Sequence, residues 1–251
     1  MSLFHPVNLV CPACKASITM DAVGSVNADR RPDLRDSIIS DQFQDTTCPA
    51  CGRGFRLQPE FNYLDVGRGQ WVAAFPAPRA ADYLAAEDEV RVVFDASYGP
   101  AAPPSAQGIG EGLTVRVTFG WPALREKIIA REAGLDDVAL ELLKLDMLRS
   151  MPEARLGPGR ELRLVRDLGA DLAFVWLDSS SEGSDGDGLV VARYAYETIA
   201  SDPEPWAEVR AQLTNGSYVD MQKLYTGRGR DAPPEDMDAT ADAILAEDVE
   251  G

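Results

Sequence analysis

Histidine is nearly absent from this chain of 251 residues, which contains only His5. Histidine is the commonest general acid or base, and catalytic zinc sites typically include one or more histidine ligands. This shortage argues against a zinc hydrolase and against an enzyme with a Ser-His-Asp triad. Catalysis by carboxylates alone stays open, because the chain contains 41 aspartates and glutamates.

The chain also lacks long apolar runs and an excess of positive charge. No apolar stretch approaches the roughly 20 residues of a membrane-spanning helix, and the first residues lack the basic and then apolar pattern of a signal peptide. The 24 lysines and arginines leave a net charge of −17. Such a surface repels phosphate backbones and anionic membranes. We therefore expect a cytoplasmic protein that binds no membrane and whose acidic surface disfavours nucleic-acid binding.

Four cysteines form two copies of one tetrapeptide, Cys11-Pro12-Ala13-Cys14 and Cys48-Pro49-Ala50-Cys51. Two cysteines three positions apart on a tight turn can direct both sulfurs to one ion, and a second such turn completes a tetrahedron. Gly52 follows the second pair and can adopt a positive φ, whereas Lys15 stands at the equivalent place after the first pair. We predict that one structural zinc ion (Zn²⁺) is bound by the four cysteines Cys11, Cys14, Cys48 and Cys51.

Two other interpretations of the cysteines compete with zinc. Cys-Pro-x-Cys also occurs in thiol oxidoreductases, where the first cysteine caps a helix. Both pairs here lead instead into strand-like sequence, over residues 16–23 and 52–57. Two structural disulfides would be unusual in a cytosolic protein. A shared zinc ion is therefore the preferred interpretation, and four cysteines leave no place for His5 as a ligand.

The spacer between the two cysteine pairs is long enough to hold structure of its own. Residues 29–39 have the pattern of a short helix, with Pro32 in its first turn and Leu34 and Ile38 on one face. The simplest role of such a helix is to pack over the cysteine-bearing domain.

Three further segments accompany the cysteine pairs: Asp33-Leu34-Arg35, Pro59-Glu60-Phe61-Asn62-Tyr63-Leu64-Asp65 and Val117-Thr118-Phe119-Gly120-Trp121-Pro122-Ala123-Leu124-Arg125-Glu126-Lys127-Ile128. Together with the cysteine motifs they resemble the CpXC family, a prokaryotic set named for its paired cysteines. The resemblance covers roughly residues 9–150. It implies a zinc-ribbon-like domain of unknown function, with the four cysteines as the matching positions and no catalytic residues to carry over.

The rest of the chain has the pattern of an α+β protein. Residues 62–66 and 70–75 flank a Gly-rich turn and predict a hairpin, which Pro76 and Pro78 bring to an end. We also expect a strand over residues 90–95, a loop rich in proline and glycine over 99–112, and a strand over 113–119 with one buried face.

A helical hairpin should follow. Pro122 opens a helix that runs to about Ala133, and Asp136 can cap the second helix. That helix carries Val138, Leu142, Leu145 and Leu148 on one stripe. Core packing is the preferred interpretation of this stripe, and the interface of a homodimer is the alternative.

The C-terminal part should contain strands over residues 160–166, 171–177 and 189–196 and a short helix over 205–213. We therefore predict three regions in an α+β fold: a zinc-ribbon-like β domain with an inserted helix (residues 1–77), a mixed body with antiparallel strands and the helical hairpin (78–228), and an acidic disordered tail (229–251).

The sequence favours a non-enzymatic interaction or ligand-binding module with a structural zinc site and an unidentified protein or small-molecule partner. Two alternatives stay open: a carboxylate-dependent enzyme in the body, and a zinc-ribbon regulator that associates with nucleic acid. Residues 1–64 hold six lysines and arginines against seven acids, which is far from the basic surface that nucleic-acid binding requires.

Overall fold

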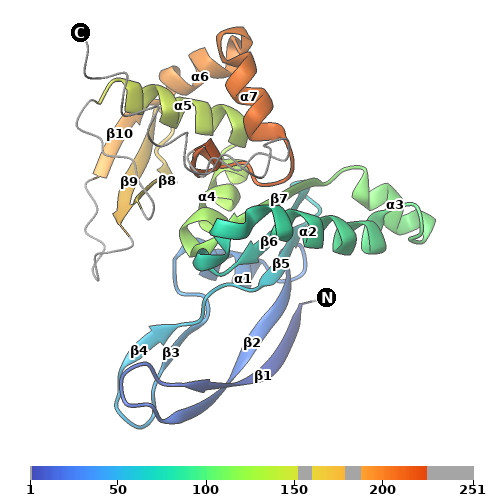
Figure 1. Cartoon of the computed structure of the whole chain (residues 1–251), viewed down its shortest axis with the longest axis vertical. Coiled ribbons are helices and arrows are strands. Elements are labelled where there is room, and N and C mark those ends of the chain that lie inside the picture. The colour runs from blue at the N-terminus through green and yellow to red at the C-terminus, as the bar shows by residue number, and fades with distance from the viewer. Residues whose placement is uncertain (1, 152–159, 179–187, 225–251) are drawn as a thin grey trace, which may run out of the picture.

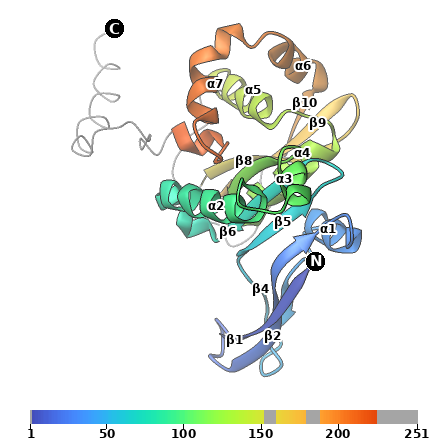
Figure 2. The same cartoon turned by 90° about the vertical axis from the view of Figure 1, so that its right-hand side faces the viewer.

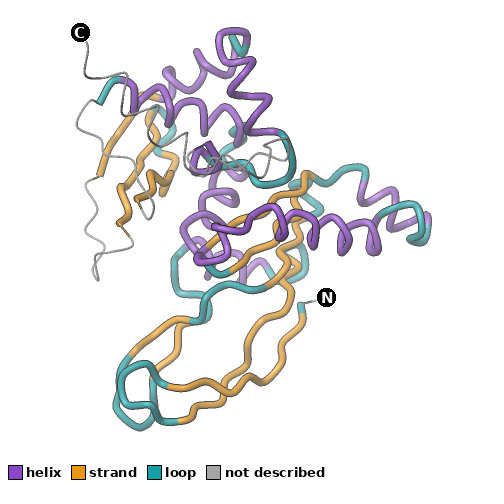
Figure 3. Tube along the Cα trace, in the orientation of Figure 1, coloured by secondary structure: helices purple, strands orange, loops and turns teal. Residues whose placement is uncertain are grey.

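The computed structural model describes residues 2–151, 160–178 and 188–224 (Figures 1 and 3). The strands are β1 (Leu3–Val10), β2 (Ser17–Asn27), β3 (Asp45–Thr47), β4 (Gly54–Arg56), β5 (Phe61–Asp65), β6 (Gln70–Phe75), β7 (Thr114–Phe119), β8 (Arg160–Asp167), β9 (Asp171–Asp178) and β10 (Gly188–Ala192). The α-helices are α1 (Pro32–Ile39), α2 (Tyr83–Tyr98), α3 (Pro104–Gly110), α4 (Gly120–Glu132), α5 (Asp137–Arg149), α6 (Arg193–Ser201) and α7 (Ala207–Thr214). The 3₁₀ helices are η1 (Ala77–Asp82), η2 (Glu204–Trp206) and η3 (Met221–Leu224). The α+β fold class is confirmed.

A mixed five-stranded sheet organises the first half of the molecule, in the order β1-β2-β5-β6-β7. The predicted hairpin of β5 and β6 is present, and β2–β5 and β6–β7 are parallel pairs. Residues alternate between the two faces of β6. Val72 and Ala74 join a core covered by α1 and α4, whereas Trp71 and Phe75 join a core covered by α2. Figure 2 shows α1 and α2 on opposite sides of this sheet.

The boundary predicted at residue 77 falls between two strands of this sheet. β6 lies before the boundary and pairs with β7 after it, from Gln70 opposite Thr114 to Phe75 opposite Phe119. The sheet and its two cores are therefore built from both sides of residue 77. The division into residues 1–77 and 78–228 stays a prediction. A smaller unit, which we call the ribbon, consists of residues 3–20 and 44–57, and it extends away from the rest of the molecule (Figures 1 and 2).

A second sheet, in the order β10-β9-β8, is antiparallel as predicted. Its residues Leu162, Leu164, Leu172 and Phe174 pack into a core with α5, α6 and α7. α4 lies between the two sheets, because Trp121 and Leu124 belong to the core of the first sheet while Ile129 and Ala130 belong to the core of the second.

The helical hairpin of α4 and α5 is also confirmed. The side chain of Asp136 caps α5, with its Oδ1 accepting from the N–H groups of Val138 and Ala139 at 2.7 and 3.0 Å. The stripe of Val138, Leu142, Leu145 and Leu148 is buried in the core of the second sheet, within the chain. A homodimer stays a prediction, and within the described residues it would use a surface other than this stripe.

The strand predicted over residues 90–95 is wrong, because these residues lie within α2. Val90, Val92 and Val93 favour a strand locally. The helix forms because Tyr83, Ala86 and Val90 recur at helical spacing and are buried against the sheet.

Two shorter expectations are also wrong. The loop predicted over residues 99–112 contains α3, in which Pro104 occupies the first turn and Gln107 donates to the carbonyl of Ala102 at 2.7 Å. The strand predicted over 189–196 ends at Ala192, and α6 begins at Arg193 because Tyr196 and Ile199 bury a helical face.

The acidic tail predicted over residues 229–251 lies outside the described residues. Within the described part of the chain, no helix has both the length and the apolar character needed to cross a membrane.

Candidate metal centre

The two cysteine pairs occupy turns with the same backbone hydrogen bonds. The N–H of Cys11 donates to the carbonyl of Ala16 and that of Cys48 to the carbonyl of Arg53, both at 2.9 Å. The carbonyl of each first cysteine accepts from the residue four positions later, which is Lys15 in one turn and Gly52 in the other. These two residues have positive φ values of 63° and 71°. The positive φ anticipated for Gly52 is present, and Lys15 adopts the same conformation.

Two hairpins bring the turns together. The first turn joins β1 to β2, and the second joins β3 to β4. Cys11 and Cys48 are buried, while Cys14 and Cys51 are exposed. Apart from the sulfurs, the ribbon holds little apolar packing: Ile18 is buried beside Cys11 and Cys48, with Ala16 and Phe55 against them.

The four sulfurs form a compact cluster, with all four within 4.8 Å of one another. The Cys11 and Cys51 sulfurs are 3.8 Å apart, and the Cys14 and Cys48 sulfurs are 3.6 Å apart. A tetrahedral ion with Zn–S distances of about 2.3 Å has S···S edges of about 3.8 Å, whereas a disulfide requires about 2.05 Å. The cysteines are therefore free thiols whose spacing fits one tetrahedral metal ion. The structure brings together all four predicted ligands, and among the described residues His5 is not part of the cluster.

Two thiols of the cluster have shifted pKa values. The backbone N–H of Cys14 stabilises a Cys11 thiolate and lowers its pKa to about 6, against the opposing effect of burial. For Cys51 the N–H of Arg53 acts in the same direction, but the thiol of Cys14, burial, and the thiols of Cys48 and Cys11 together outweigh it and raise its pKa to about 12. Four thiolates at this spacing repel one another, so a cation is needed for all of them to ionise together.

We expect Gly52→Ala to weaken metal binding by roughly 1 kcal/mol, about fivefold in affinity, because alanine is strained at this positive φ. The strain would come from the backbone alone, since an added Cβ at Gly52 has no atom within 4 Å. Lys15→Gly should change the affinity in the opposite direction, because it relieves the same conformation in the other turn. Competition against a chelator measures both, and equal affinities for the three proteins would contradict the argument.

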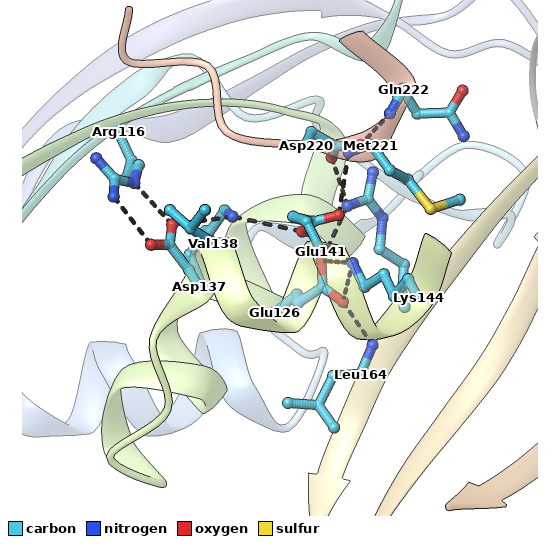
Figure 4. A network of polar contacts seen from close by, with 12 residues as sticks. Arg116, Glu126, Asp137, Val138, Glu141, Lys144, Leu164, Asp220, Met221 and Gln222 are labelled. Carbon is cyan, nitrogen blue, oxygen red and sulfur yellow. Dashed lines mark hydrogen bonds and ion pairs between the residues drawn. The ribbon is translucent and has the colours of Figure 1, made fainter. Parts of the chain in front are cut away.

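A second polar feature, which sequence reasoning missed, lies between α4, α5 and β8 (Figure 4). We call it the buried charge network, and it consists of Arg116, Glu126, Lys127, Asp137, Glu141, Lys144, Arg163 and Asp220. Four cations face four carboxylates. The Lys144 ammonium lies 2.7 Å from the carboxylate of Glu126 and 3.0 Å from that of Glu141. A glutamate and a lysine three positions apart on a helix, such as Glu141 and Lys144, normally indicate a solvated face. The sequence pattern therefore did not predict that they are buried.

The network also connects Asp220 and Met221, near the end of the described chain, to α5 and β8. Arg163 lies between Glu126 and Asp220, at 2.9 and 2.6 Å. Backbone groups complete the carboxylates: the N–H of Leu164 donates to Glu126 at 2.6 Å, and that of Met221 donates to Glu141 at 3.0 Å. These buried carboxylates are thus held by cations and backbone donors, and they present no free acid–base pair to solvent.

Burial raises the pKa of Glu126, Asp137 and Asp220, but the neighbouring cations outweigh it and hold each pKa below its ordinary value. The principal cation is Lys144 for Glu126, Lys127 for Asp137 and Arg163 for Asp220. For Glu141 burial prevails, and its pKa is raised.

Because the pKa of Asp137 is lowered in the folded protein, the free energy of unfolding should depend on pH. An aspartate whose folded pKa lies below its unfolded value of about 3.9 contributes fully above that pH, and its contribution is lost as the pH falls toward the folded pKa. We expect Asp137→Asn to lower stability near neutral pH, yet to show a shallower loss of unfolding free energy than the wild type between about pH 5 and pH 3. Asp146→Asn, on an exposed position of the same helix, should parallel the wild type in urea unfolding. Parallel curves for Asp137→Asn would refute the assignment.

Comparison with known proteins identifies one similarity. A family model described as CpXC protein matches residues 9–144, which is more than half of the chain and includes all four cysteines. No curated protein and no solved structure matches the chain.

Proposed function

The chain belongs to the CpXC family, and from that premise we propose that it is a non-enzymatic interaction or ligand-binding module whose four cysteines hold one structural zinc ion. The observation that carries the proposal is the compact cluster of four sulfurs on two matching turns, with two separations of 3.8 and 3.6 Å that suit a tetrahedral site with Zn–S bonds. Four sulfur ligands favour zinc or iron over the harder divalent cations.

A structural role follows from the number of ligands. Four thiolates fill the coordination sphere of tetrahedral zinc and leave no position for an activated water. Glu126, Glu141 and Asp220 of the buried charge network are inaccessible to solvent, which gives the enzymatic alternative little support. Free thiols fit a reducing compartment, so we place the protein in the cytoplasm.

Elemental analysis of protein purified without chelators tests the proposal. We expect one zinc ion per chain, released by a chelator together with four titratable thiols. Replacement of zinc by Co²⁺ should give the absorption of a tetrahedral four-sulfur site. Iron at one ion per chain would refute the identity of the metal, and metal-free protein that is equally resistant to protease would refute the structural role.

A further inference from the structure

A groove runs between α4 and β8, away from the cysteines. It consists of two adjoining pockets of about 630 and 640 Å³, a size typical of small-molecule sites. Arg125, Val165 and Arg166 line both pockets, so the two lie side by side along the same residues. We call it the α4–β8 groove.

The floor of the groove is apolar because, among the described residues, the helices α5, α6 and α7 pack on the other face of the second sheet. Leu172 and Phe174 of β9 point into the helical core, so Ala173, Val175 and Leu177 point to the opposite face. These three side chains line the first pocket and are only half-buried. The floor thus offers hydrocarbon surface that the rest of the described chain does not fully cover.

The acids around the groove already have partners. Four carboxylates line it, and each lies within ion-pair distance of an arginine: Asp36 of Arg35, Asp41 of Arg56, Glu132 of Arg35, and Asp167 of Arg193. None of these arginines lines the groove. The negative charge at the rim is therefore largely compensated from outside.

The two arginines shared by both pockets differ from these. Within the described residues, neither Arg125 nor Arg166 forms an ion pair, and the Nε of Arg125 is buried without a hydrogen-bond partner. A buried donor without a partner is unfavourable and rare in folded proteins. In a chain of net charge −17, the part-buried Arg125 and the exposed Arg166 leave positive charge beside an apolar floor, and this indicates a place for an anionic group.

We propose that the α4–β8 groove binds a small amphipathic carboxylate. Its carboxylate accepts hydrogen bonds from Arg125 and Arg166, and its hydrocarbon part lies on the floor formed by β9. This assignment extends the proposed function, because it names the ligand class of a module proposed above to bind a partner. It does not depend on the metal, which the cysteines hold elsewhere.

Titration of the full-length, metal-loaded chain with octanoate tests the assignment by calorimetry. Saturable binding at one site is expected. Octanamide, which has the same chain without the charge, should bind at least tenfold more weakly. Acetate and inorganic phosphate, which supply charge without the chain, should show no saturation in the same range. Equal binding of octanoate and octanamide, or no binding of octanoate at millimolar concentration, would overturn the proposal.

Three variants locate the site. Arg125→Gln should weaken octanoate binding at least tenfold, and Val175→Asp should abolish it by placing a charge on the floor. Arg91→Gln removes the same charge from an exposed position of α2 outside the groove and should bind like the wild type. The melting temperature of Arg125→Gln should not fall, because its Nε has no partner to lose. Unchanged octanoate affinity in this variant would refute the site, and its zinc content separates that failure from a failure of the metal assignment.

Discussion

Lys144→Met is expected to lower the free energy of unfolding by about 3–5 kcal/mol, because it removes one partner from a buried group of charges. Lys144 is completely buried and lies within 3.0 Å of the carboxylates of both Glu126 and Glu141. Methionine has nearly the same length but no charge. Without Lys144, Glu126 still has Arg163 at 2.9 Å and the N–H of Leu164. Glu141 keeps the N–H of Met221, but its nearest remaining cation is Lys127 at 3.5 Å, so Glu141 loses the larger share of its stabilisation.

A double variant distinguishes the loss of charge from the loss of packing. Glu141→Gln keeps an oxygen that accepts from the N–H of Met221 and removes the stranded charge. Lys144→Met with Glu141→Gln should therefore be more stable than the sum of the two single changes predicts. Arg91→Met, which breaks an exposed pair on α2, should change stability by less than about 0.5 kcal/mol. Urea unfolding at pH 7 measures all four proteins, and a loss below about 1 kcal/mol for Lys144→Met would show that the network contributes little.

The sequence predicts the cluster of four cysteines well, because its information is local. Two cysteines three positions apart define each turn, and the hydrogen bonds that shape the turns join residues at most five positions apart. Only the meeting of the two turns depends on the distant fold. The same holds for the cap at Asp136 and for the hairpin of β5 and β6, whose signals also lie within a few residues.

The buried charge network could not be predicted in the same way. Glu141 and Lys144 have the spacing of an ordinary surface pair, and their burial depends on Arg163 and Asp220, which arrive from β8 and from the C-terminal segment. The parallel pairing of β6 with β7 has the same character, since α2 and α3 separate the two strands in the chain. The error at residues 90–95 had another cause: a window of six residues shows the strand propensity of the valines but not the helical recurrence that begins at Tyr83.

The ribbon is the part of the molecule whose stability should depend most on the metal. Its apolar cluster contains little beyond Ile18 and the cysteines themselves, which is far too small to offset the conformational entropy of ordering its chain. Metal binding supplies most of the folding free energy in sites of this size. The second half of β2 is different: Val23 and Val26 belong to the core of the first sheet, and residues 25–27 pair with β5.

Cys48→Ser should therefore abolish stoichiometric zinc binding and unfold the ribbon while the rest of the molecule stays folded. Trypsin provides a sharp readout, because Lys15 and Arg53 lie in the ribbon, whereas Arg35 lies on α1, which packs against α4. We expect rapid cleavage after Lys15 and Arg53 and continued protection after Arg35. Thr47→Ser, a change at the exposed neighbouring position, should keep both the zinc and the resistance.

The position of the new cleavage sites also locates the domain boundary. Cleavage confined to residues 3–20 and 44–57 would mean that the metal-dependent unit ends within β2 and that α1, β5 and β6 fold with the body. Cleavage after Arg35, with loss of the main thermal transition, would instead make the first 77 residues one cooperative unit. If Cys48→Ser lost its zinc but kept its full resistance to trypsin, the metal would not be structural, because the ribbon would then be stable without it despite its few apolar contacts.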